Sequence, residues 1–173
     1  MILINFILFQ LAWFSCVLGA AKGMPWLGVA VTIVILCWHF HKARQAKPEF
    51  ILISAALVIG ACFDQLMLWM HIVVYQQHGW SLSLVPVWIL ALWVAFATTL
   101  NVSLAWMQGR YLISILLGAA GGPLAYLGAE RIGAILLQGY PSYIALSLGW
   151  AVITPTFLYL ASQLNGFKTE HSS

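Results

Sequence analysis

An acidic residue in the middle of an apolar stretch is the strongest candidate for chemistry in this chain. Asp64 lies near the centre of a long hydrophobic segment. A carboxylate at the centre of a bilayer costs about 2.5–3.5 kcal/mol on insertion scales, so it must face protein or water. If the segment is helical, Asp64, His71 and Tyr75 share one face. We interpret Asp64 and His71 as candidate acid–base residues; a polar clamp between helices is the alternative.

Further polar residues occur in two later segments. Thr98 and Asn101 lie three residues apart in an apolar stretch that also contains Trp93. Glu130 and Arg131 lie where another stretch ends. We predict that all five contact a substrate, with Arg131 holding a lipid phosphate or pairing with Glu130 or Asp64. The alternatives are packing bonds between helices, about 0.6 kcal/mol each, and an arginine that extends to the headgroups without a ligand.

Metal and cofactor signatures are absent from the sequence. His39 and His41 point to opposite sides of a helix and have no third ligand nearby. There is no HExxH, no glycine-rich phosphate loop, no GxSxG and no CxxCH. We therefore expect no metal and no cofactor, and whether the protein is an enzyme stays open.

The elements that position these residues follow from composition. Of 173 residues, 63% are hydrophobic and 6% charged, and the mean hydropathy is +0.97. Soluble domains carry about 25% charged residues. At roughly 20 residues per crossing, the chain holds about six transmembrane helices. The sequence predicts an all-α polytopic bundle forming a single membrane domain, residues 1–173.

The predicted spans are bounded by polar or turn-forming residues. They cover residues 2–21, 25–40, 50–75, 86–107, 111–129 and 143–164. No basic residue precedes the first apolar run, so we expect a retained helix and no signal peptide. The apolar stretch 132–137 is too short to cross; it is either the end of a long fifth helix or a segment on the outer surface.

The basic residues predict the orientation. Lys22 and Arg131 fall on one side of a six-span bundle, and five basic residues fall on the other: Lys42, Arg44, Lys47, Arg110 and Lys168. This places both termini and the loop 41–49 in the cytoplasm. The net charge of +3 is thus a topology signal, and we expect no nucleic-acid partner.

Two blocks of sequence resemble an uncharacterised bacterial inner-membrane family. They are the stretch from Pro86 to Trp106 (PVWILALWVAFATTLNVSLAW) and the pair GGPLAY at 121–126 and RIGA at 131–134. The family is domain of unknown function 2878. The resemblance covers nearly the whole chain and implies a Gram-negative cytoplasmic membrane location. It implies no reaction, and it favours a lipid as the partner.

These observations lead to one functional hypothesis and one rival. The first is a polar cleft facing the outer leaflet, lined by Asp64, His71, Thr98 and Arg131, that binds or modifies a lipid or lipid-like substrate. The rival is a non-catalytic membrane subunit or small proton-linked transporter. Besides membrane lipids, a membrane protein partner or a second copy of the chain is a candidate partner.

Overall fold

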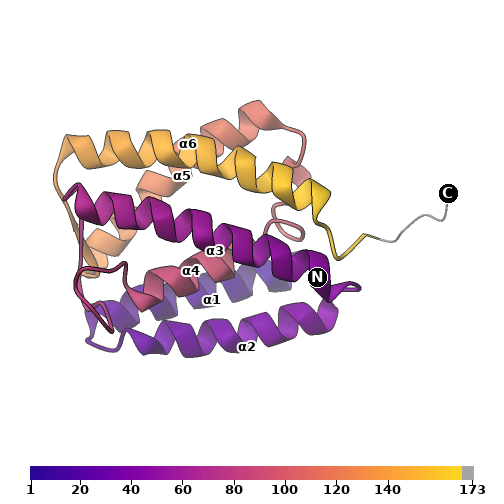
Figure 1. Cartoon of the computed structure of the whole chain (residues 1–173), viewed down its shortest axis with the longest axis horizontal. Helices are drawn as coiled ribbons and strands as arrows, with labels where there is room; N and C mark the ends of the chain where they lie inside the picture. Colours follow the sequence, from indigo (N-terminus) through magenta and orange to yellow (C-terminus); the bar gives the residue numbers. More distant parts are fainter. Residues whose placement is uncertain (169–173) are drawn as a thin grey trace.

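The computed structural model describes residues 1–168, which form six α-helices in a bundle (Figure 1). The helices are α1 (Ile2–Ala21), α2 (Trp26–Lys42), α3 (Ala46–Trp69), α4 (Val87–Ala97), α5 (Tyr111–Ile132) and α6 (Tyr140–Gln163). A 3₁₀ helix, η1 (Ala105–Met107), and two short strands, β1 (Val73–Tyr75) and β2 (Ile135–Leu137), complete the fold. The predicted all-α bundle of about six helices is confirmed, with a small strand pair added.

The outer surface of the bundle is largely apolar and therefore suited to the hydrocarbon core of a membrane. Four helices, α1, α3, α5 and α6, are long and apolar enough to cross a membrane, and α2 and α4 are shorter apolar helices. Large apolar side chains project outward along the helices, as Leu3 (69% exposed), Leu112 (70%) and Val152 (66%) do. Such a surface would aggregate in water. The protein is therefore an integral membrane protein.

The six helices alternate in direction. In Figure 1, α5 and α6 form one side of the molecule, α1 and α2 the other, and α3 and α4 lie between them. The N-terminus, the α2–α3 turn and the end of α6 lie at one end of the bundle. This fits an even number of crossings; the side of the membrane that this end faces stays a prediction.

Helix α3 ends earlier than the predicted span 50–75. It stops at Trp69, and the chain turns through His71, whose φ is 54°. Strand β1 then pairs antiparallel with β2, with Val73 opposite Leu137 and Tyr75 opposite Ile135. In the short apolar stretch 132–137, Ile132 ends a fifth helix longer than the predicted span 111–129, and Ile135–Leu137 form the strand β2. Whether this strand lies on the outer surface stays a prediction.

The predicted span 86–107 is α-helical only in its first half. Helix α4 has 11 residues, roughly 16 Å, and irregular turns follow it inside the bundle. Thr98 and Thr99 each donate a hydroxyl hydrogen bond to a carbonyl three residues back, at 2.7 and 2.6 Å. Such bonds compete with the helical pattern.

Asn5 in α1 supplies hydrogen bonds that the irregular backbone would otherwise lack. Its Nδ2 donates to the Thr98 carbonyl at 3.0 Å, and its Oδ1 accepts from the Ser103 N–H at 3.3 Å. Gln108 Nε2 donates to the Leu100 carbonyl at 3.0 Å. Non-helical backbone at membrane depth is tolerated only where protein groups satisfy it in this way.

Helices α5 and α6 pack closely through small residues. A Cβ at Gly122 would lie 2.2 Å from the Trp150 ring, and one at Gly118 would lie 2.3 Å from the Trp150 carbonyl. Pro123 lacks an N–H, which leaves the Ala119 carbonyl without its helical donor. The Ser147 hydroxyl of α6 donates to that carbonyl at 2.9 Å. The two helices therefore form one hairpin unit.

Candidate functional site

Asp64 is fully buried and accepts three side-chain hydrogen bonds. The Tyr75 hydroxyl donates to its Oδ1 at 2.5 Å, and Trp93 Nε1 donates to its Oδ2 at 2.6 Å. The Tyr126 hydroxyl also donates to Oδ1. The donors come from β1, α4 and α5, while Asp64 lies on α3. One carboxylate thus joins four elements, and we call these four residues the Asp64 cluster.

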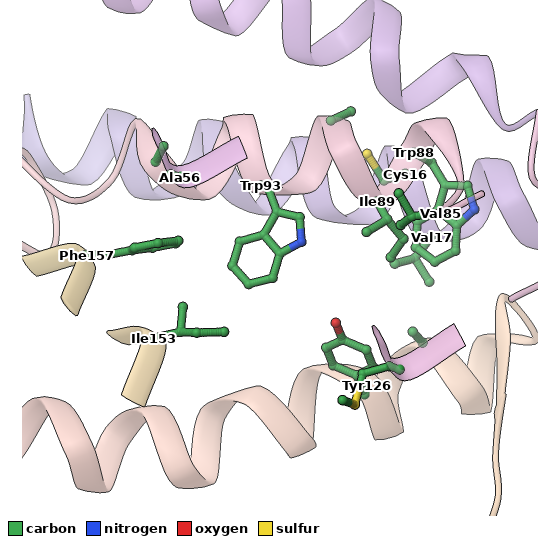
Figure 2. Packing of buried hydrophobic residues seen from close by; sticks show 14 of the residues in the cluster. Cys16, Val17, Ala56, Val85, Trp88, Ile89, Trp93, Tyr126, Ile153 and Phe157 are labelled. Atoms are coloured by element: carbon green, nitrogen blue, oxygen red, sulfur yellow. The ribbon is translucent and has the colours of Figure 1, made fainter. Parts of the chain in front are cut away.

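Local packing fixes the position of Trp93. Gly60 lies one helical turn before Asp64, and a Cβ there would come within 2.0 Å of the Trp93 ring. On its other side Trp93 stacks on Trp150, with centroids 4.9 Å apart and planes 16° apart. Figure 2 shows Trp93 and Tyr126 reaching from opposite helices toward the same space. The glycine therefore lets the indole N–H approach the carboxylate.

Tyr75 reaches the cluster from outside the helices. Burial, and then the neighbouring Asp64, raise the pKa of its phenol well above the usual range. The phenol stays protonated and acts as a donor. Three donors on one acceptor group make the cluster a satisfied polar network at membrane depth.

A cavity of about 560 Å³ lies beside the Asp64 cluster. Its walls come mainly from α1, α4, α5 and α6, and both Asp64 and Tyr126 border it. Five of the nine tryptophans of the chain line it: Trp13, Trp88, Trp93, Trp106 and Trp150. Apolar, aromatic walls with a few polar groups are typical of small-molecule sites of this size.

The cavity is bordered by residues on the lipid-facing surface. Phe14 of α1 is 48% exposed, and Leu117 and Leu124 of α5 are 47% and 64% exposed. These side chains belong to helices long and apolar enough to cross a membrane, so this border of the cavity lies on the apolar surface of the bundle. Within residues 1–168, no lysine, arginine or histidine lines it.

The structure brings together only two of the seven predicted site residues, Asp64 and Trp93. His71 lies beyond the end of α3 and is exposed, so the predicted helical face that placed it beside Asp64 is not formed. Tyr75 reaches Asp64 instead, because β1 folds back. Arg131 is exposed, and Glu130 accepts a hydrogen bond from the Leu137 N–H at 2.7 Å. Neither contributes to the cavity wall.

Thr98 and Asn101 also lie away from the cavity, and Asn101 belongs to a second buried cluster. Glu49, fully buried, accepts from Asn101 Nδ2 at 2.7 Å, from the Gly166 N–H at 2.8 Å and from His39 Nε2 at 2.9 Å. These contacts join α2, α3, the segment after α4 and the chain beyond α6. We call this group the Glu49 cluster.

Sequence reasoning missed Glu49 and Asn5. Glu49 was assigned to a polar loop, although an acid beside Pro48 ahead of an apolar run is typical of a first helical turn. Asn5 is an amide inside an apolar span, and that isolation was an available signal. Tyr126 was seen only as part of a sequence block, and nothing in its spacing indicates a bond to Asp64.

Fold and site together define a polytopic helical membrane protein with a lateral apolar cavity beside a buried carboxylate. The chain belongs to the family described as protein of unknown function DUF2878, whose sequence model matches residues 2–156. That range includes every residue of the cavity wall and of the Asp64 cluster. No curated protein and no solved structure matched the chain.

Proposed function

We propose that this protein binds a lipid-like molecule whose apolar chain occupies the cavity between α1, α4, α5 and α6. The observation that carries the proposal is an aromatic-walled cavity of about 560 Å³ bordered by lipid-facing residues. We further propose a bacterial cytoplasmic membrane, which the family resemblance implies. The five-to-two distribution of basic residues supports an orientation with the N-terminus and the α2–α3 turn inside.

The extent of the cavity favours a long ligand. Its lining runs from Trp88 and Ile135, near the strand pair, to Met107 of η1 at the other side of the bundle. Such a space suits an extended hydrocarbon chain better than a compact polar solute. Access from the bilayer would also supply the ligand at the high local concentration that lipids have there.

Gly121 allows a direct test of occupancy. It lines the cavity, and a Cβ at this position meets nothing within 4 Å. Gly121→Phe therefore places a ring in the cavity and obstructs part of it. Ala120→Phe adds the same ring to a neighbouring exposed position outside the cavity wall and is the matched control.

The measurement is covalent labelling by a photoactivatable hexadecyl probe in nanodiscs, with the labelled peptides identified by mass spectrometry. We expect labelling of cavity peptides to fall at least about fivefold in Gly121→Phe, because more than 1 kcal/mol of apolar contact is lost. Ala120→Phe is expected to match the wild type. Equal labelling of all three proteins would overturn the proposal.

A second candidate function rests on Asp64 itself. Acids within membrane segments often handle protons, so a proton-linked transporter or an acid–base enzyme acting on the bound molecule is the rival. Asp64→Asn keeps the shape of the side chain and removes its charge. A folded variant that fails to restore the lipid profile of cells lacking the gene would favour this candidate. Full restoration would remove it.

A further inference from the structure

We infer that the bound molecule is uncharged within the cavity and carries a carbonyl or hydroxyl oxygen that accepts hydrogen bonds from Thr154 and Trp150. This inference rests on the proposed function and names the ligand class. Both residues lie on α6 one helical turn apart, and both line the cavity.

Thr154 is the first of two unpaired donors. It is 5% exposed, and its Oγ1 has no hydrogen-bond partner among the described residues. A threonine in a helix usually donates to a carbonyl of the preceding turn. Thr156, two residues on, does so, to the Val152 carbonyl at 2.7 Å. Thr154 therefore departs from the local pattern at the position where α6 borders the cavity.

Trp150 Nε1 is the second donor of the pair. It too is buried and makes no hydrogen bond of ordinary geometry in residues 1–168, and the Tyr126 hydroxyl, which donates to Asp64, is close enough to interact with it. The ring is fixed by stacking on Trp93, so its N–H has a fixed place in the wall. An unpaired buried donor is costly. An acceptor on the ligand would satisfy both donors.

The charges around the cavity favour a neutral ligand over an anionic one. Among the described residues of the wall, Asp64 alone carries a formal charge, and it already has three donors. With no basic side chain lining the cavity in the described chain, a phosphate or carboxylate would lack a counterion and would face this acid. A neutral oxygen acceptor needs no counterion and is not repelled by Asp64.

The depth of Thr154 in the membrane distinguishes this ligand from an ordinary phospholipid. Thr154 lies 14 residues after the start of α6 and 9 before its end, roughly 21 Å and 14 Å along the axis. The hydrocarbon core is about 30 Å thick, so Thr154 sits near its middle. Phospholipid ester groups lie near the interface. The class that fits is a neutral long-chain ester, ketone or alcohol.

The test is competition against the photoactivatable hexadecyl probe in nanodiscs of zwitterionic phospholipid. Methyl palmitate, hexadecane and palmitate are the competitors. We expect methyl palmitate to displace the probe at about three- to tenfold lower concentration than hexadecane, the advantage of one or two neutral hydrogen bonds. Palmitate is expected to compete less well than its ester.

Thr154→Val removes the hydroxyl and keeps the shape, so it should reduce the advantage of the ester, by the share of one of the two donors, without changing competition by hexadecane. Thr156→Val, on the exposed side of the same helix, is the matched control and should keep it. Trp150→Phe removes the second donor and gives an independent reading if Thr154→Val does not fold, as judged by gel filtration.

The outcomes separate the two proposals. If Gly121→Phe removes labelling but the ester and the alkane compete equally, the cavity binds chains and the ligand class is wrong. Stronger competition by palmitate than by its ester would also overturn the ligand class. If Gly121→Phe leaves labelling intact, the proposed function itself fails.

Discussion

Replacing Asp64 by leucine tests whether one carboxylate holds the cluster together. The side chain is similar in size but accepts no hydrogen bond. Tyr75, Trp93 and Tyr126 would each lose their acceptor inside a dry interior. We expect a strong loss of stability, because the donors come from β1, α4 and α5 and lose the one acceptor group that they share.

The magnitude can be bracketed. Hydrogen bonds between membrane helices average about 0.6 kcal/mol, so three bonds give a lower bound of about 2 kcal/mol. Leaving three buried donors unsatisfied costs about 1–3 kcal/mol each, so the upper bound is about 9 kcal/mol. Asp64→Asn should fall between the wild type and Asp64→Leu, because Oδ1 can still accept from the tyrosines while the new amide faces the Trp93 N–H.

Unfolding in mixed micelles, titrated with a denaturing detergent and followed by tryptophan fluorescence and circular dichroism, gives the free energies. Tyr75→Phe is the control that removes one donor only, and we expect a loss of about 1 kcal/mol. The order wild type, Tyr75→Phe, Asp64→Leu should hold. If Asp64→Leu unfolds at the same detergent fraction as the wild type, the cluster contributes nothing and its structural role is refuted.

Three other predictions follow from named contacts. Glu49→Ala leaves His39 Nε2 and the Gly166 N–H without an acceptor and removes one of the two acceptors of Asn101 Nδ2, so we expect a loss of about 3–5 kcal/mol in the same unfolding assay, much reduced in Glu49→Gln. Gly60→Ala should cost about 1–3 kcal/mol, because its Cβ meets Trp93, whereas Gly121→Ala should be neutral or gain up to about 1 kcal/mol. Reporter fusions at the turn 43–45 and after residue 168 should report the same side of the membrane, and opposite sides would contradict the six-crossing topology.

The helices could be predicted because each leaves a direct mark in the sequence. Apolar runs of about 20 residues, separated by basic loops or glycines, can hardly be anything but membrane helices. That reasoning located α1, α2, α5 and α6 to within a few residues. Asp64 stood out for the same reason, since an acid at that depth demands polar neighbours.

The partners of Asp64 could not be predicted, because they depend on breaks in the helices. A helical continuation past Trp69 would have carried His71 beside Asp64, but the chain turns there and pairs as a strand. That pairing brings Tyr75 back from 11 residues away. The hydropathy pattern does not reveal such a turn, because Val73 and Val74 are equally apolar in a strand and in a helix.

The position of these polar contacts explains how a bundle in lipid can keep a cavity open. Apolar side chains of a helix are stabilised about equally by another helix and by acyl chains, so packing alone does not fix the spacing between the α5–α6 hairpin and the other helices. Polar contacts fix this spacing. The hairpin is tied by the bond from Tyr126 to Asp64, by Ser142, which donates to the Ile72 carbonyl at 2.6 Å, and by the β1–β2 pair. Beyond the other end of α6, the Glu49 cluster holds the Gly166 N–H. Between these contacts the cavity is lined by many large aromatic side chains, and the space is left for an occupant.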